Sequence, residues 1–159
     1  MIDVINLQRN TRLDSHVFRK YVQQLSSTVD DAKGKSFSVA FVSDKRMIEL
    51  NKFFRGKDTT TDVLSFPYES DQFVQSAQFN VPTQVQTEAL DMSTDFLGDI
   101  VVSAEQAAKQ AKENKLSLEN EIKQLILHGL LHLCGYDHET DNGEMAAREL
   151  ELRDKLSIS

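Results

Sequence analysis

One apolar helix constrains this chain more than any other feature. Residues 117–134 place apolar side chains at helical spacing on nearly every side, which is typical of a buried helix. His128 and His132 interrupt this stretch four residues apart, and that spacing puts both imidazoles on one face of a helix. A fold that buries this helix must therefore enclose two polar rings in an interior cleft.

A third histidine follows the helix. Gly135 predicts the end of the helix, because glycine adopts left-handed backbone angles at little cost. The chain can then fold back and bring His138 to the other two rings. Three neutral imidazoles with one open position are a catalytic zinc arrangement. We therefore predict one zinc ion per chain, held by His128, His132 and His138, rather than three hydrogen-bonded core histidines.

Two other kinds of metal site fit the pattern less well. Metzincin proteases share this spacing but carry a glutamate general base directly after the first histidine, where this chain has Gly129. Hydrolysis of peptides or amides would need a carboxylate from elsewhere, such as Asp62 or Asp99. A structural zinc would want a fourth ligand, and Cys134, two residues after His132, points away from the ligand face. We expect Cys134 to be a small buried residue.

The rest of the chain predicts a single α+β domain over residues 1–159. One mixed sheet of about four strands, packed with about five helices, is the simplest architecture, with the zinc site on the central buried helix. Asp14, Asp44, Ser103 and Ser117 are the expected helix N-caps, Gln106 completes a capping box with Ser103, and Gly56 is expected at a helix C-terminus. Strands are expected at residues 1–7, 36–43, 62–66 and 97–102, and helices at 14–30, 44–54, 103–115, 117–134 and 142–156.

Residues 69–95 differ from the rest of the sequence. They are rich in Gln, Ser, Thr and Asp with weak periodicity, and they predict a long mobile loop. No apolar run in the chain approaches the roughly 18 residues that span a bilayer, and the N-terminus lacks the pattern of a signal peptide. The single cysteine excludes an intrachain disulfide. We expect a soluble, cytoplasmic protein with no membrane partner.

Charge is unevenly distributed. The net charge is −7, yet residues 1–57 hold 11 Lys and Arg against 6 Asp and Glu. A basic first third permits a local anion-binding surface on an acidic chain. Arg55 lies at the end of a predicted helix, before the polar turn that contains Lys57 and Asp58. Its guanidinium is suited to clamping a phosphate through two N–H groups, although a surface ion-pair turn would look the same.

Three segments together resemble the YbeY endoribonuclease family. The run His-Gly-Leu-Leu-His-Leu-Cys-Gly-Tyr-Asp-His at residues 128–138 is similar to that family's signature. Arg-Gly-Lys-Asp from residue 55, Thr-Asp-Val-Leu-Ser-Phe-Pro at 61–67 and Leu-Gly-Asp-Ile-Val at 97–101 match its other landmarks in the same order. The resemblance extends from about Leu50 to the end. Thr60 stands where proline is expected, and the 69–95 segment is longer than usual.

The resemblance implies a bacterial, cytoplasmic, single-strand-specific, metal-dependent endoribonuclease. It implies a role in maturation of ribosomal RNA, notably the 3′ end of 16S rRNA, and in ribosome quality control. Single-stranded RNA, ribosomal RNA and ribosome or small-subunit assembly components are the expected partners. Two alternatives remain: a zinc-dependent hydrolase of peptides or amides, and a non-catalytic ribosome-assembly factor with a structural zinc.

The mechanistic hypothesis assigns catalysis to Arg55, His128, His132 and His138. Zinc would bind a water or a phosphate oxygen, and Arg55 would bind the same phosphate and favour its developing negative charge. The general base is not identified. The RNA 2′-OH could itself be the nucleophile. Asp137 is a candidate for orienting a histidine, or it caps the last turn.

Overall fold

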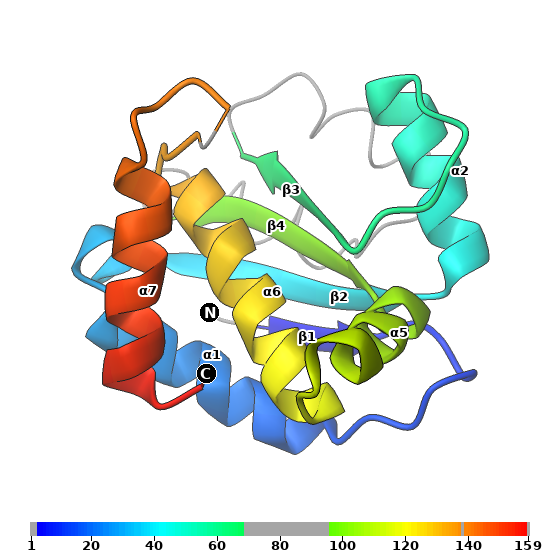
Figure 1. Ribbon diagram of the computed structural model, residues 1–159, viewed down its shortest axis with the longest axis horizontal. Coiled ribbons are helices and arrows are strands. Elements are labelled where there is room, and N and C mark those ends of the chain that lie inside the picture. Colours follow the sequence, from blue (N-terminus) through cyan, green and yellow to red (C-terminus); the bar gives the residue numbers. More distant parts are fainter. Residues whose placement is uncertain (1–2, 69–95, 138, 159) are drawn as a thin grey trace.

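The sheet has four strands, in the order β1-β2-β4-β3 (Figure 1). Strands β1 (Asp3–Asn6), β2 (Ser36–Val42) and β4 (Phe96–Ser103) run parallel, and β3 (Val63–Pro67) pairs antiparallel with β4. The structure is a computed structural model that describes residues 3–68, 96–137 and 139–158. Within these ranges the sheet is mixed, as predicted, and β3 lies at one end of it.

Five α-helices pack on this sheet within the described ranges. Figure 1 shows α6 crossing the sheet, with α7 on one side of it and α5 on the other. The predicted α+β class, with one mixed sheet and five helices, is confirmed. The helices are α1 (Ser15–Thr28), α2 (Asp44–Arg55), α5 (Ala104–Asn114), α6 (Leu118–Leu133) and α7 (Glu144–Leu156).

The two faces of the sheet bury different cores. Ile100 and Val102 belong to the larger core, which includes side chains from α1, α6 and α7. Val101 alternates with them and belongs to a smaller core, in which Met47 and Leu50 of α2 take part. Helix α6 is central and buried, as expected. Five of its side chains have no exposed surface, namely Ile122, Ile126, Leu127, Leu130 and Leu131.

Most of the predicted caps are confirmed. The side chains of Asp14, Ser103 and Ser117 each accept a hydrogen bond from a backbone N–H in the first turn of α1, α5 and α6. The capping box at α5 is only half formed, because the Ser103 N–H donates to the Asp62 carbonyl at 2.9 Å, while the Gln106 amide donates to Asp44 at 3.4 Å. Gly56 ends α2 in the left-handed region, at φ 70°. No helix in the described part of the chain is long and apolar enough to cross a membrane.

The predicted cap of α2 was wrong by one residue. Ser43 is the N-cap, and its hydroxyl accepts a hydrogen bond from the Arg46 N–H at 3.2 Å. Asp44 is the first helical residue, and its carboxylate accepts hydrogen bonds from the hydroxyls of Thr60 and Ser103. Because the Asp44 carboxylate is bonded to these distant segments, the neighbouring Ser43 caps the helix instead. The expected 69–95 loop lies outside the described residues.

Helix α6 approaches the sheet closely at Gly129. A Cβ atom added there would lie 2.9 Å from Cγ2 of Ile100 and 3.2 Å from Oγ of Ser65. The Ser65 hydroxyl donates to the Gly129 carbonyl at 3.1 Å, which joins the helix to β3. A glutamate, as metzincins carry at this position, has no room here. The missing protease base therefore has a packing cause.

This contact predicts that Gly129→Ala destabilises the protein. Alanine alone would favour the helix by about 1 kcal/mol, but overpacking a tight core typically costs about 1–3 kcal/mol. We expect a net fall of up to about 2 kcal/mol in the free energy of unfolding, measured in urea. In an Ile100→Ala background the cost should shrink, because the closest atoms are gone. A stabilising Gly129→Ala would contradict the close contact.

Candidate active site

His128 and His132 lie together on one face of α6, as the sequence predicted. Their ring centroids are 4.8 Å apart, and the ring planes meet at 77°. The side chain of His128 is 31% exposed, so it is neither a core residue nor fully solvated. The two imidazoles therefore form one polar feature in the second half of α6, where the other side chains are apolar.

A carboxylate from another helix holds His128. Its Nδ1 lies 2.6 Å from Oε1 of Glu149 on α7, and a carboxylate only accepts, so Nδ1–H is the donor. Arg153 donates to the other oxygen of Glu149 at 2.5 Å. Burial would raise the pKa of Glu149, but the hydrogen bonds and charges of His128 and Arg153 outweigh burial and hold that pKa below its ordinary value. Glu149 is thus an ionised partner that fixes the His128 ring.

A backbone carbonyl holds His132 in the same way. Its Nδ1 donates to the Tyr136 carbonyl oxygen at 3.1 Å. The chain reaches this position through Gly135, whose φ of 103° favours glycine. The Tyr136 N–H in turn donates to the Leu131 carbonyl, so the segment folds back on the end of α6. The predicted bend after the helix therefore fixes the second histidine.

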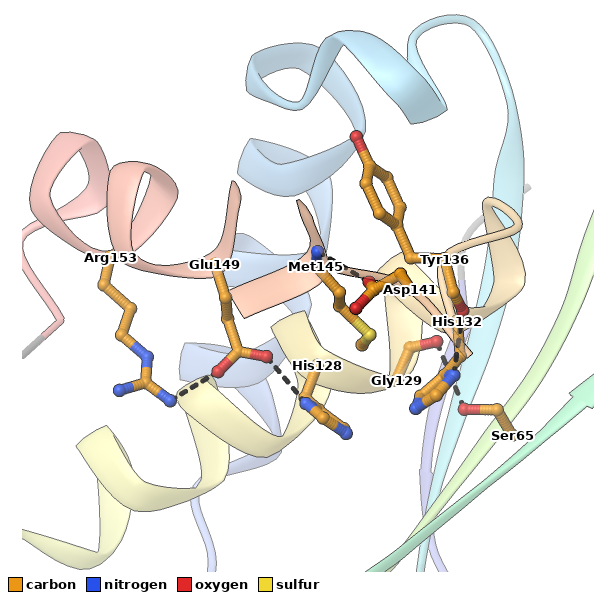
Figure 2. A network of polar contacts seen from close by, with 9 residues as sticks. All are labelled: Ser65, His128, Gly129, His132, Tyr136, Asp141, Met145, Glu149 and Arg153. Carbon is orange, nitrogen blue, oxygen red and sulfur yellow. Dashed lines mark hydrogen bonds and ion pairs between the residues drawn. The ribbon is translucent and has the colours of Figure 1, made fainter. Parts of the chain in front are cut away.

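Both rings consequently use Nδ1 for orientation. Figure 2 shows their other nitrogens on facing sides of the two rings, and Nε2 is the atom each would offer to a metal. This donor set suits zinc, because a hydrogen-bond acceptor holds each imidazole through Nδ1. His138, the predicted third ligand, lies outside the described residues. Within the described ranges no three potential ligands converge on one point.

A cleft of about 680 Å³ opens beside the histidines. Strand β3 and its approach, including Asp62, line the cleft together with His128 and His132. Arg55, at the end of α2, lines it too and is exposed. The structure thus brings the predicted phosphate-binding arginine and two of the predicted metal ligands to one cavity, although they are far apart in the sequence.

The turn after Arg55 is pinned to α2 at two points. The Asn51 side chain, only 2% exposed, donates to the Thr59 carbonyl at 2.9 Å. The hydroxyl of Thr60, the residue that replaces the expected proline, donates to Asp44 in the first turn of α2. Hydrogen bonds therefore supply the restraint that a proline ring would otherwise give.

Asp137 and Cys134 lie near the histidines in the sequence, and the structure shows the surroundings of each. Asp137 is exposed, and its side chain accepts from the Glu139 N–H at 3.0 Å, so it caps the turn. The orienting carboxylate is instead Glu149, 21 residues after His128 on a different helix, and no local pattern marks it. Cys134 is partly buried against the core, and burial raises the pKa of its thiol to about 11.

Only one of the two candidate carboxylates reaches the cleft. Asp62 lines it, with Oδ1 accepting from the Val63 N–H at 2.7 Å. Asp99 is 5% exposed on β4, alternates with Ile100, and so points to the sheet face opposite α6. Burial raises the pKa of Asp99 to about 7, and its Oδ1 has no hydrogen-bond partner among the described residues.

Comparison with known proteins places this geometry in a family. The family model described as Endoribonuclease YbeY matches residues 3–157. The chain belongs to the YbeY endoribonuclease family. The YbeY endoribonuclease of Nautilia profundicola is 41% identical over 137 residues, covering 86% of this chain and 84% of that protein. The one from a Sulfurovum species is 34% identical over 160 residues, covering 99% and 94%.

A solved structure shows the same fold. The solution structure of a protein from Thermotoga maritima superposes with a TM-score of 0.61 at 24% sequence identity. The match covers 98% of this chain and 89% of that one. The YbeY resemblance seen in the histidine, arginine and Leu-Gly-Asp segments is confirmed by the family match.

The Glu149 contact predicts weaker metal binding when it is lost. Removing a carboxylate that orients a histidine ligand typically costs about 10- to 100-fold in metal affinity. We expect a loss of that size for Glu149→Ala and a smaller loss for Glu149→Gln, whose amide oxygen still accepts a hydrogen bond. Zinc affinity would be measured by competition with a chromogenic chelator. Glu151→Gln, an exposed position on α7, is the control, and equal affinity in all three variants would contradict the role of Glu149.

The buried Asp99 carboxyl predicts that the free energy of unfolding depends on pH. Its pKa of about 7 in the folded protein lies above the ordinary value of 3.8, so between these two pH values the folded state holds a proton that the unfolded state has lost. Its contribution to stability is therefore present at low pH and lost as pH rises through about 7. Asp99→Asn should be stabilising relative to the parent at pH 8 and less so at pH 5, in urea unfolding. Exposed Asp154→Asn should show no such difference, and a pH-independent effect of Asp99→Asn would refute the assignment.

Proposed function

We propose that this protein is a zinc-dependent endoribonuclease that cleaves single-stranded RNA and matures the 3′ end of 16S ribosomal RNA. One observation carries the proposal: in a chain of the YbeY endoribonuclease family, two oriented imidazoles and a phosphate-binding type of side chain line one cleft. We further propose that it acts in the cytoplasm, also in ribosome quality control, with ribosome or small-subunit assembly components as partners.

His128, His132 and His138 would hold the single zinc ion. The support is chemical: Nδ1 of His128 and of His132 is already used to fix its ring, which assigns Nε2 to the metal. Bound zinc would supply a Lewis acid for reaction at a phosphate. Glu149 and the Tyr136 carbonyl then act by keeping the rings in the orientation that ligation needs.

Arg55 would bind the phosphate that is cleaved. A guanidinium presents its N–H donors as a rigid fork that matches phosphate oxygens. The residue is exposed at the rim of the cleft, and the turn that follows it is pinned at Thr59 and Thr60. A donor group that is already in position stabilises the negative charge that develops on the phosphate.

Asp62 would accept the proton of the attacking hydroxyl. It lines the cleft with His128, whereas Asp99 points to the other face of the sheet. The hydroxyl is either that of a water or the RNA 2′-OH, and a 2′,3′-cyclic phosphate among the products would identify the latter. Because a carboxylate does reach the cleft, hydrolysis of peptides or amides is the second candidate function.

Substitutions should separate metal binding from cleavage. His128→Ala and His132→Ala are expected to lose both the one bound zinc and the cleavage of unstructured RNA, because each removes a ligand. Arg55→Glu should keep the zinc and lose cleavage by about 100-fold or more, since it replaces an electrostatic donor with a charge that repels phosphate. Zinc is measured on the purified protein, and cleavage with a labelled single strand.

Lys52→Glu makes the same charge change on the exposed surface of α2 and should leave cleavage unchanged. Cleavage by a metal-free His128→Ala protein would point to a contaminating nuclease and overturn the proposal. Hydrolysis of casein in place of RNA would favour the peptidase alternative. A purely structural zinc predicts that normal function survives Arg55→Glu and that metal removal unfolds the protein.

A further inference from the structure

A second groove runs along α6 from the candidate active site. It has a volume of about 540 Å³, and Asp62 and His128 line both this groove and the cleft. Its walls come from three helices: Gln110 and Asn114 of α5, Glu121 and Gln124 of α6, and Glu149 and Arg153 of α7. A ligand at the histidines therefore has a direct continuation between α5 and α7.

The groove has the length for part of a nucleotide. Glu121, Leu125 and His128 lie on successive turns of one helix face, and seven residues of α-helix rise about 10 Å. The side chains of Leu116 and Leu125 add apolar surface to a lining that is otherwise polar. A flat ring with polar edges matches such a lining, since one group of atoms can stack while the others form hydrogen bonds.

The polar groups in the groove include both donors and acceptors, and Glu121 is the buried one among them. Glu121 is 4% exposed, and its Oε1 accepts a hydrogen bond from the Asn114 amide at 2.9 Å. Arg153 has a buried Nε with no hydrogen-bond partner among the described residues. Three carboxylates, those of Asp62, Glu121 and Glu149, line the groove and would repel a phosphate. The group that fits is therefore an uncharged base.

We propose that this groove receives the nucleobase next to the cleaved phosphate, and that Glu121 selects bases carrying an exocyclic amino group. Adenine, cytosine and guanine can each donate an amino N–H to the carboxylate. Uracil has no amino group, and the carbonyls on both sides of its single imino N–H would face the carboxylate oxygens. Leaving a buried acceptor unpaired is costly, so uracil is rejected. This inference rests on the proposed function.

The experiment uses the zinc-loaded full chain and a pool of single-stranded RNA with randomised bases. Sequencing the product ends gives the frequency of each base around the cut. We expect uracil to be depleted about tenfold at one position beside the cut, which corresponds to about 1.4 kcal/mol. Glu121→Gln should largely abolish that depletion, because its amide can donate to a uracil carbonyl. Glu113→Gln, an exposed neighbour on α5, should leave the profile unchanged.

Asn114→Ala provides a second, exposed substitution in case the buried Glu121→Gln does not fold. It removes the amide that positions Glu121 and should weaken the depletion at the same position. A wild-type profile without uracil depletion overturns the groove assignment and leaves the proposed function intact. The same holds if either groove variant gives the same base profile as the wild type. A wild-type protein that cleaves no RNA overturns the proposed function, and the groove assignment with it.

Discussion

The contact between Gly129 and the sheet is the constraint on which the candidate site depends. Helix α6 can lie against β3 and β4 only because position 129 has no side chain, and the Ser65 hydroxyl then reaches the helix backbone. The same contact sets His128 and His132 beside the approach to β3, where Asp62 and the cleft are. A tight backbone contact thus decides two things together: which strand borders the histidines, and that no glutamate follows the first of them.

Groups from outside α6 complete the candidate site around its two histidines. His128 is oriented by Glu149 of α7, and His132 by the carbonyl that follows the bend at Gly135. Arg55 comes from the opposite side of the sheet, at the end of α2, and its turn is held by Asn51. Each reactive group therefore has a support from a different segment, which is how a small domain keeps an open site in a defined geometry.

Sequence reasoning predicted what local patterns control. The paired histidines, the caps at Asp14 and Ser117 and the extent of the sheet follow from spacing and from short-range hydrogen bonds. Features set by distant contacts could not be found this way. Glu149 is marked by nothing near His128, and Ser43 rather than Asp44 caps α2 because Asp44 bonds to segments 16 and 59 residues away. Whether Asp62 or Asp99 reaches the cleft similarly depends on which face of the sheet each side chain of β4 points to.

The support of His128 by α7 has a consequence for the order of synthesis. Glu149 is translated 21 residues after the histidine it orients, and the Gln124 amide of α6 donates to the carbonyl of Ile158 at 2.8 Å, beyond the end of α7. A nascent chain that has made α6 therefore lacks the group that aligns the first histidine. An RNA-cleaving enzyme that emerges from a ribosome, next to RNA, would therefore lack an aligned His128 until α7 has been made and has packed.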